Sequence, residues 1–283
     1  NVVVKNRAQV FGYYDHNMLV MSERLTEHLP KSDKFTPKQK LWYIRAKEVV
    51  ISSGSIERPL VFGNNDTPGV LLSSAAKEYM KVYGVLVGKK PIIFTNNDSA
   101  YETAIEFKKN GVDPIVLDSR KELSSDLIKE AKSLGINIKF EYVVVNANGY
   151  RKVKSADIAK ISDDKTTLGK IENIACDCIC VSGFWTPTIH LASQSGGKTK
   201  FNEEIDAFIP SKSKQNETTV GSANGIFNLQ DSLNTSFETG YNLSKKITKE
   251  DNKLSVPTVV EKKSSKHDKF WCVPLPKGKK YKR

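Results

Sequence analysis

Two turns built from small residues are the parts of this sequence best suited to chemistry. Ser52-Ser53-Gly54-Ser55 follows the β-branched run Val49–Ile51, and Gly221–Gly225 follows the strand-like Thr218–Val220. Small side chains at the end of a buried strand let the backbone approach a flat or charged ligand such as a dinucleotide. The competing interpretation is an ordinary exit from a strand, with a glycine in a left-handed conformation.

Three strands lead into the first turn. Residues 2–10, Met18–Ser22 and Leu41–Ile51 have strand-like composition, and the first two are separated by the tight polar segment Gly12–Asn17. The sequence therefore predicts a three-stranded antiparallel meander, with its third strand ending at the first small-residue turn.

A second pattern follows the first turn. Residues 69–82 have the apolar spacing of one helical face, and a strand at 92–95, a helix at 100–109 and a strand at 114–117 come next. The last strand ends at Asp118, about twenty positions after the strand-to-helix turn, as in half of a Rossmann domain. Strands at 136–140, 142–146, 150–161, 166–173 and 175–182 are expected to complete this region, with a helix at 123–134 before them.

The glycine fingerprint of a dinucleotide site is absent from this second pattern. Thr95, Asn97 and Ala100 stand where the three glycines are expected, and Asp98 places a carboxylate where the helix start would attract a phosphate. We therefore interpret it as a degenerate dinucleotide domain with a structural role. A mononucleotide contact through Asp118 is the alternative.

The bulk composition excludes several function classes. The net charge of +12 is concentrated in the Lys-rich residues 248–283, which favours a solvated surface over a nucleic-acid site, and no nucleic-acid-binding motif is present. No apolar run reaches the roughly 18–20 residues of a membrane span. Cys176, Cys178 and Cys180 alternate along one expected strand, so they should point to the same side as reduced core thiols of a cytoplasmic protein. We expect no metal site and no catalytic residue.

Five blocks in order carry a family resemblance: FGYYDHN at 11–17, SGSIERPLVFGNNDTPGV at 53–70, FTNNDSAYETA at 94–104, CDCICVSGFWTPTIHLASQSGGK at 176–198, and GSANGIF at 221–227. Together they resemble the alpha subunit of the heterotetrameric, bacterial-type sarcosine oxidases. The resemblance extends over nearly the whole chain and implies an excised, central NAD-binding region of a longer polypeptide.

The implied fold class is α/β, a glutathione-reductase-like FAD/NAD(P)-binding two-domain fold with a three-stranded β-meander, its first βαβ unit missing from the fragment. The implied domains are a discontinuous NAD-binding domain at 1–68 and 174–247, an inserted degenerate Rossmann-like domain at 69–173, a basic linker at 248–269 that we expect to be mobile, and the start of a following domain at 270–283.

The resemblance also implies a set of cofactor contacts. Flavoproteins usually carry Gly-Asp at the second turn, where the aspartate binds a ribityl hydroxyl of FAD, whereas Ser222 stands here and suits NAD. The expected NAD contacts are Val10 near the adenine, Ser53, Gly54, Ser55, Gly221, Ser222, the amide of Ile226 at the start of a helix expected at 226–247, and Asn228. Arg58 is the candidate for an anion or FMN-phosphate contact, with an ion pair to Glu57 or another carboxylate as the alternative.

The family's reaction is the oxidative demethylation of sarcosine to glycine, with hydrogen peroxide formed and the methyl carbon passed to tetrahydrofolate. The resemblance implies NAD in this chain, FMN at a subunit interface, FAD in a partner subunit, and beta, gamma and delta subunits as partners. Two alternatives stay open: a related opine oxidase or amine dehydrogenase subunit, and a structural module that has lost cofactor binding.

Overall fold

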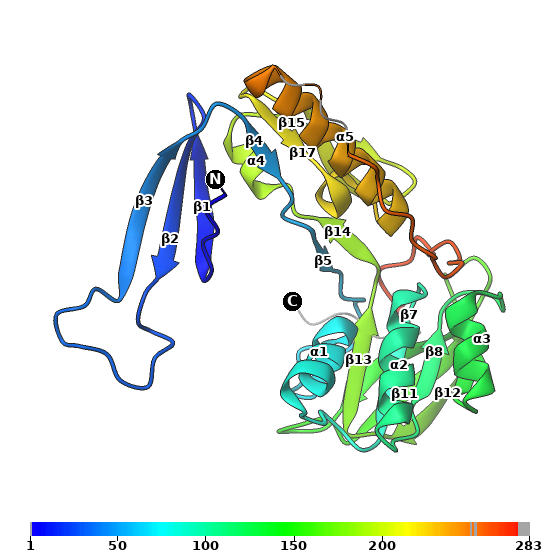
Figure 1. Ribbon diagram of the computed structural model, residues 1–283. Helices are drawn as coiled ribbons and strands as arrows, with labels where there is room; N and C mark the ends of the chain where they lie inside the picture. The colour runs from blue at the N-terminus through cyan, green and yellow to red at the C-terminus, as the bar shows by residue number, and fades with distance from the viewer. Residues whose placement is uncertain (1, 250, 252–253, 277–283) are drawn as a thin grey trace. The chain divides into compact units, whose positions relative to one another are not determined.

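The computed structural model describes residues 2–249, 251 and 254–276 (Figure 1). The chain forms two compact units, which are described separately: unit 1 comprises Asn1–Ile56 and Thr186–Glu261, and unit 2 comprises Glu57–Trp185 and Lys262–Arg283. The chain crosses between the units three times: in β5 (Ser55–Glu57), in β14 (Trp185–Pro187), and between Glu261 and Lys262. Strands β5 and β14 pair with each other.

Unit 1 is built on a β-meander and a short parallel strand pair. Its remaining elements are β1 (Ala8–Tyr14), β2 (Met18–Arg24), β3 (Gln39–Arg45), β4 (Val49–Ile51), α4 (His190–Gln194), β15 (Lys198–Asn202), β16 (Ala207–Lys212), β17 (Glu217–Thr219), the 3₁₀ turn η1 (Gly221–Asn224) and α5 (Leu229–Thr248). Strands β1, β2 and β3 form an antiparallel sheet, which confirms the predicted meander. Strands β15 and β16 form a separate hairpin.

The prediction of one strand over Leu41–Ile51 is wrong. β3 ends at Arg45, and β4 is a separate strand that pairs in parallel with β17. The two strands differ in partner and direction, and β-propensity carries no information about either. Tyr13 and Leu19 of the meander pack in one small core with Val49 and Ile51 of β4, so the meander is anchored to the strand pair by side-chain packing.

Unit 2 has three layers (Figure 1). Its elements are β6 (Val70–Leu72), α1 (Ser73–Tyr83), β7 (Pro91–Thr95), α2 (Ser99–Lys109), β8 (Ile115–Asp118), α3 (Asp126–Ser133), β9 (Asn137–Phe140), β10 (Tyr142–Asn148), β11 (Ser155–Ile161), β12 (Leu168–Ala175) and β13 (Cys178–Ser182). A parallel sheet of order β6-β13-β7-β8-β9 carries the three helices on one face and the antiparallel sheet β10-β11-β12 on the other. The predicted succession of strand, helix and strand is confirmed as β7, α2 and β8.

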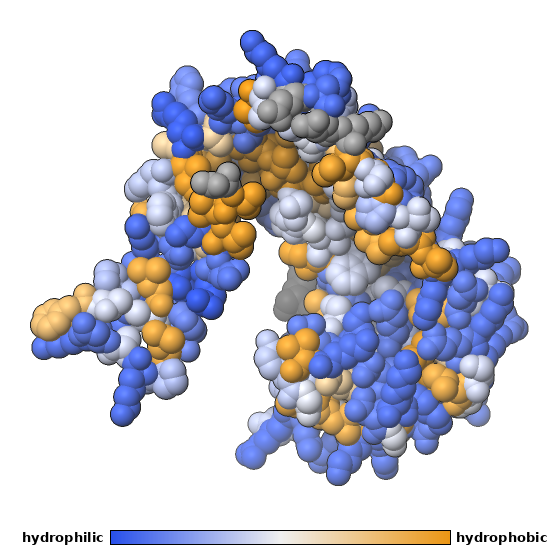
Figure 2. Space-filling model, in the orientation of Figure 1, coloured by the Kyte–Doolittle hydropathy of each residue, from blue (hydrophilic) through white to orange (hydrophobic). Residues whose placement is uncertain are grey.

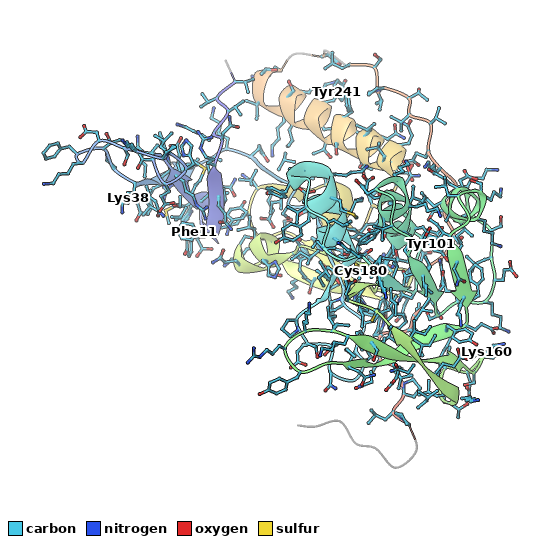
Figure 3. All side chains as sticks on the ribbon, turned by 90° about the horizontal axis from the view of Figure 1, so that it is seen from below. Phe11, Lys38, Tyr101, Lys160, Cys180 and Tyr241 are labelled. Carbon is cyan, nitrogen blue, oxygen red and sulfur yellow. The ribbon has the colours of Figure 1, made fainter. Side chains whose placement is uncertain are left out.

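Side chains along the central strands alternate between two cores. On β13, Cys178 and Cys180 enter the core under the helices, whereas Ile179 and Val181 enter the core against the antiparallel sheet. In Figure 3, Tyr101 and Cys180 lie among the helices and parallel strands, and Lys160 lies on the antiparallel sheet. Figure 2 shows that the outward side of α2 and α3 is largely hydrophilic, as expected for helices that bury one face.

The prediction that three cysteines point to one side is wrong for Cys176. Strand β13 begins only at Cys178, because Asp177 leaves the strand geometry and its carboxylate accepts hydrogen bonds from the amides of Lys89 and Lys90, at 2.9 and 2.8 Å. Cys176 therefore packs in the core on the opposite face from Cys178. Burial raises the pKa of the Cys176 thiol to about 12, which makes it inert.

The units divide the chain at positions other than those expected. Residues 57–68 were expected in the first domain, but Leu60 and Phe62 lie in the core of unit 2. Strand β13 also stays in unit 2, between β6 and β7.

The basic segment is a second difference. Its part from Lys262 onward belongs to unit 2, where Phe270 and Val273 are buried in the core, so this part is packed rather than a mobile linker. The expected start of another domain at 270–283 is likewise part of unit 2 over its described residues, and residues 277–283 lie outside the described part of the chain.

Candidate functional site

The two small-residue turns meet at one end of a parallel strand pair. Thr219 of β17 is in register with Ile51 of β4, and the Val220 amide donates to the Ile51 carbonyl at 2.9 Å, so both strands end at the same level. The turns at 52–55 and 221–225 thus follow the carboxyl ends of neighbouring parallel strands. Ligands of open α/β sheets bind at such ends.

Gly54 of the first turn lies near Ser222 of the second turn. Gly54 has a φ of +75°, and a Cβ built on it would lie 3.9 Å from Ser222 Oγ. Gly221 has a φ of +64° and open space around its missing Cβ, with no atom within 4 Å. Among the described residues, the Ser222 hydroxyl has no hydrogen-bond partner. The turns therefore form a shallow floor with one hydroxyl available.

The first turn is held in place by two hydrogen bonds to the backbone of Thr188. Ser53 Oγ donates to the Thr188 carbonyl at 2.8 Å, and the Thr188 amide donates to the Gly54 carbonyl at 3.0 Å. Ser55 follows in β5 and is half-buried. Hence the Ser53 side chain supports the turn.

The helix after the second turn begins later than expected. α5 begins at Leu229 rather than Ile226, because the Asn228 side chain caps it by accepting from the Asp231 amide at 2.8 Å. The Ile226 amide donates within the turn, to the Gly221 carbonyl at 3.2 Å, and is therefore not a helix-start donor.

The start of α5 also carries a carboxylate from the chain itself. Glu261 accepts from the Gln230 amide at 2.9 Å and from the side-chain amide of Asn228. A negative group at this position is stabilised by the helix dipole. A nucleotide contact by Asn228 would therefore have to displace Glu261.

Val10 and Arg58 lie in different units. Val10 of β1 is half-buried and packs on the core that contains Ile51, the last residue of β4. The Arg58 guanidinium carbon lies 3.9 Å from the centre of the Trp271 ring, a cation–π contact within unit 2. The alternative partner Glu57 instead accepts from the Ser74 amide at the start of α1, at 2.7 Å.

The acidic residues of the Rossmann-like half form a closed buried cluster. Arg120 Nη2 lies 2.8 Å from Asp98 Oδ1 and 2.7 Å from Asp118 Oδ2, and the three side chains are 4%, 3% and 0% exposed. Asp118 also accepts from the Tyr101 hydroxyl at 2.8 Å and from the Arg120 amide at 3.0 Å. Both oxygens of Asp118 are thus engaged, which argues against the alternative of a nucleotide contact through Asp118.

The charges of this cluster are mutually stabilised. Burial alone would lower the pKa of Arg120, but the hydrogen bonds and charges of Asp118 and Asp98 outweigh burial and raise it. Burial, followed by the Asp118 charge, raises the pKa of Tyr101, so its hydroxyl stays a donor. The sequence drew attention to Asp98 and Asp118 but missed Arg120, whose only signal was a cation two residues after Asp118.

A partly buried carboxyl group lies at the opposite end of β17. Glu217 accepts from Ser195 Oγ at 3.0 Å, and its burial raises its pKa. A raised pKa in the folded state means that this group favours folding at acid pH, and that its contribution is lost as the pH rises through the folded pKa.

Glu217→Gln is therefore expected to stabilise unit 1 at pH 7, by at most about 1 kcal/mol because the half-exposed group is partly screened. Thermal unfolding followed from pH 4 to 8 should show the gain disappear at acid pH. Glu23→Gln is the control of opposite sign, since the hydrogen bond from Trp42 lowers the pKa of Glu23 and that carboxylate stabilises the fold at neutral pH. A uniform loss of stability in Glu217→Gln at all pH values would contradict the prediction.

The described part of the chain contains no group of three or more His, Cys, Asp or Glu side chains arranged to hold a metal ion. Within the same residues, no helix is both long and apolar enough to span a membrane.

No family model matches the chain. The curated proteins that it resembles in sequence have the same name. The sarcosine oxidase subunit alpha of Corynebacterium sp. (strain P-1) is 34% identical over 237 residues, which are 83% of this chain and 24% of that protein. The sarcosine oxidase subunit alpha of Rhizobium meliloti (strain 1021) is 35% identical over 225 residues, 79% of this chain and 22% of that protein. The chain thus spans about a quarter of the length of these relatives.

Solved structures agree on the fold. L-proline dehydrogenase from P. horikoshii matches with a TM-score of 0.50 at 21% identity, over 89% of this chain and 46% of that one. The flavoprotein disulfide reductase RclA from Escherichia coli matches with a TM-score of 0.56 at 13% identity, over 84% of this chain and 49% of that one. The fold class is therefore that of FAD/NAD(P)-binding flavoproteins, as predicted. The chain is a homologue of one section of the alpha subunits of sarcosine oxidases.

Proposed function

We propose that unit 1 binds NAD across its two small-residue turns. The observation that carries the proposal is the approach of Gly54 to Ser222 at the carboxyl ends of β4 and β17. Side-chain-free backbone on one turn and an available hydroxyl on the other suit a ribose or pyrophosphate. Ser222 replaces the acidic residue that a ribityl chain would require, which favours NAD over FAD.

The residues of this chain have separate parts in the proposed binding. Gly54 and Gly221 allow the nucleotide to approach the backbone, Ser222 donates to or accepts from a ribose hydroxyl, and Ser53 and Ser55 hold the first turn. Val10 contributes an apolar surface for the adenine, while Ile226 and Asn228 fix the second turn and the start of α5. When bound, NAD is a hydride acceptor, but no residue of this chain is proposed to be catalytic.

The proposed setting is the alpha subunit of a sarcosine-oxidase-like flavoenzyme, an oxidoreductase acting on a CH–NH bond. By homology, sarcosine would be demethylated to glycine, with hydrogen peroxide formed and the carbon passed to tetrahydrofolate elsewhere in the complex. FAD would lie in the beta subunit, FMN at an interface near Arg58, and gamma and delta subunits would complete the assembly. A related opine oxidase or amine dehydrogenase would differ in the amine.

A second candidate is a structural module without a nucleotide. The start of α2 carries Asp98, and the start of α5 is covered by Glu261. Carboxylates at both helix starts compete with phosphate for the positive ends of the helix dipoles. This observation favours loss of nucleotide binding at the starts of α2 and α5. It does not apply to the two small-residue turns that contain Gly54 and Ser222.

Nucleotide release from the complex tests the proposal. The full-length gene product, co-expressed with the subunits encoded beside it, is denatured and the released nucleotides are separated by chromatography and mass. We expect NAD at about one per alpha subunit, together with FMN and FAD. Flavin without NAD would reject the NAD site, and no nucleotide at all would support the structural module.

A further inference from the structure

Residues 262–273, termed the covering segment, lie over the place where an α/β domain of this kind binds its ligand. In unit 2 the chain runs from β7 outward to β8 and β9, while β13 pairs on the other side of β7. The switch point of the sheet is therefore at the carboxyl ends of β7 and β13, where ligands of open α/β sheets bind. The covering segment passes this edge, and its contacts are specific.

The first contact is made at the end of β7. The side-chain amide of Asn96 donates to the carbonyls of Asp268 and Phe270, at 2.9 and 3.0 Å, and the Asp268 amide donates to the Asn96 carbonyl at 2.9 Å. Asn96 is completely buried. Three hydrogen bonds thus fix the backbone of the covering segment against the loop that would touch a nucleotide.

The second contact is made by the buried charge cluster. Asp98 Oδ2 accepts from the Ser265 amide at 2.6 Å and from the Ser264 hydroxyl at 3.2 Å, while Arg120 donates to the Lys266 carbonyl at 3.1 Å. Asp98 stands at the start of α2, where a bound phosphate would accept the same kind of amide hydrogen bond. The Asp98 carboxylate therefore binds the covering segment at the helix start, the position at which such a phosphate would lie.

The remaining contacts extend the packing in both directions. The Lys263 amide donates to Asp126 at the start of α3, at 2.8 Å, and the Lys263 carbonyl accepts from the Asp126 amide at 3.1 Å. The His267 ring stacks on Phe184, with ring centres 3.9 Å apart. Phe270 and Val273 are 5% and 1% exposed in the core of unit 2. The segment is therefore held along its length.

We propose that the covering segment permanently occupies the nucleotide crevice of unit 2, with Asp98 and Arg120 as the side chains that bind it. The ligand edge of this domain has become a binding site for the domain's own chain, and unit 2 accepts no nucleotide. The proposal is independent of NAD binding in unit 1, because the contacts that carry it are all made within unit 2.

Limited trypsin digestion of the chain tests the occupancy. Lys263 and Lys266 have exposed side chains but a hydrogen-bonded backbone, whereas Lys31 and Lys34 lie in the exposed connection between β2 and β3. Cleavage requires local opening, so we expect cutting after Lys263 and Lys266 to be at least about 100-fold slower than after Lys31 and Lys34. Equal rates at the two places would overturn the proposal.

A pair of variants tests the role of Asp98. Asp98→Asn leaves one acceptor oxygen where the carboxylate has two, so its NH2 group must face either the Ser265 amide or the Arg120 guanidinium. We expect this variant to speed cleavage after Lys263 and Lys266 by about tenfold or more. Asp113→Asn is the control, since Asp113 is 83% exposed and forms an ion pair with Lys108. The same increase in both variants, or in neither, would reject Asp98 as the holding residue.

Hydrogen exchange of the unmodified protein tests permanence without any variant. The Ser265 and Asp268 amides should be protected to the same degree as amides of β7, with and without 1 mM AMP, ADP or NAD. Nucleotide-dependent loss of protection at 263–270 would overturn the proposal, because it would show that the crevice opens for a ligand.

Discussion

Replacement of Arg120 by methionine is expected to lower the free energy of unfolding of unit 2 by about 3–5 kcal/mol. The guanidinium joins Asp98 and Asp118, which are 3% and 0% exposed, and methionine leaves both carboxylates without their cation in a site that water does not reach. Chemical unfolding followed by tryptophan fluorescence in a Trp42→Phe background measures the loss, because the remaining Trp185 and Trp271 both lie in unit 2. The deficit should shrink at acid pH, where protonation removes the uncompensated charges.

Lys121→Met is the matched control for this variant. Lys121 is the next residue in the chain and pairs with Asp163 at 2.8 Å, but both side chains are well exposed, at 66% and 70%. Solvent screens such a pair, so we expect little change in stability. Equal losses in Arg120→Met and Lys121→Met would contradict the view that the buried cluster holds unit 2 together.

The local elements of unit 2 could be predicted from the sequence because their signals are local. Apolar spacing within ten residues places β7, α2 and β8, and this is sufficient for a Rossmann-like half. The packing of the covering segment on this Rossmann-like half could not be predicted, because Asn96 contacts residues more than 170 positions further along the chain. The Lys-rich composition of residues 248–269 predicts a mobile linker. Composition does not reveal that Phe270 and Val273, which follow, are buried in the core of unit 2.

In unit 1 as well, some features of the candidate site could be predicted from the sequence and others could not. The turns containing Gly54 and Gly221 were found from strand-ending patterns, and β4 and β17 bring them together through parallel pairing. The predicted start of α5 at Ile226 is three residues too early, because the apolar pattern of the helix extends to residues that precede the capping residue Asn228. Asparagine is a favourable N-cap residue, but the sequence alone does not show that Asn228 is the cap. The hydrogen bond that it accepts from the Asp231 amide shows this.

Gly54→Val is expected to reduce NAD binding by at least about 30-fold, equivalent to about 2 kcal/mol. A Cβ at this position lies 3.9 Å from Ser222 Oγ, and the two methyl groups of valine would extend into the space between the turns where the nucleotide is proposed to lie. The measurement is the amount of NAD per alpha subunit released from the complex purified with its partner subunits, together with the apparent Kd for added NAD.

The effect of backbone strain in Gly54→Val must be separated from obstruction of the NAD site by the valine side chain. Gly54 has a φ of +75°, which valine adopts only at a cost in free energy. Gly84→Val supplies this separation: Gly84 ends α1 with a φ of +64°, and a Cβ there meets no atom within 4 Å. It carries a similar backbone penalty in the other unit, so its NAD content should equal that of the unmodified protein. Loss of NAD in both variants would indicate general destabilisation, and retention in both would exclude the Gly54 turn from the nucleotide site. Loss in Gly54→Val alone would identify the floor formed by Gly54 and Ser222 as the surface that NAD covers.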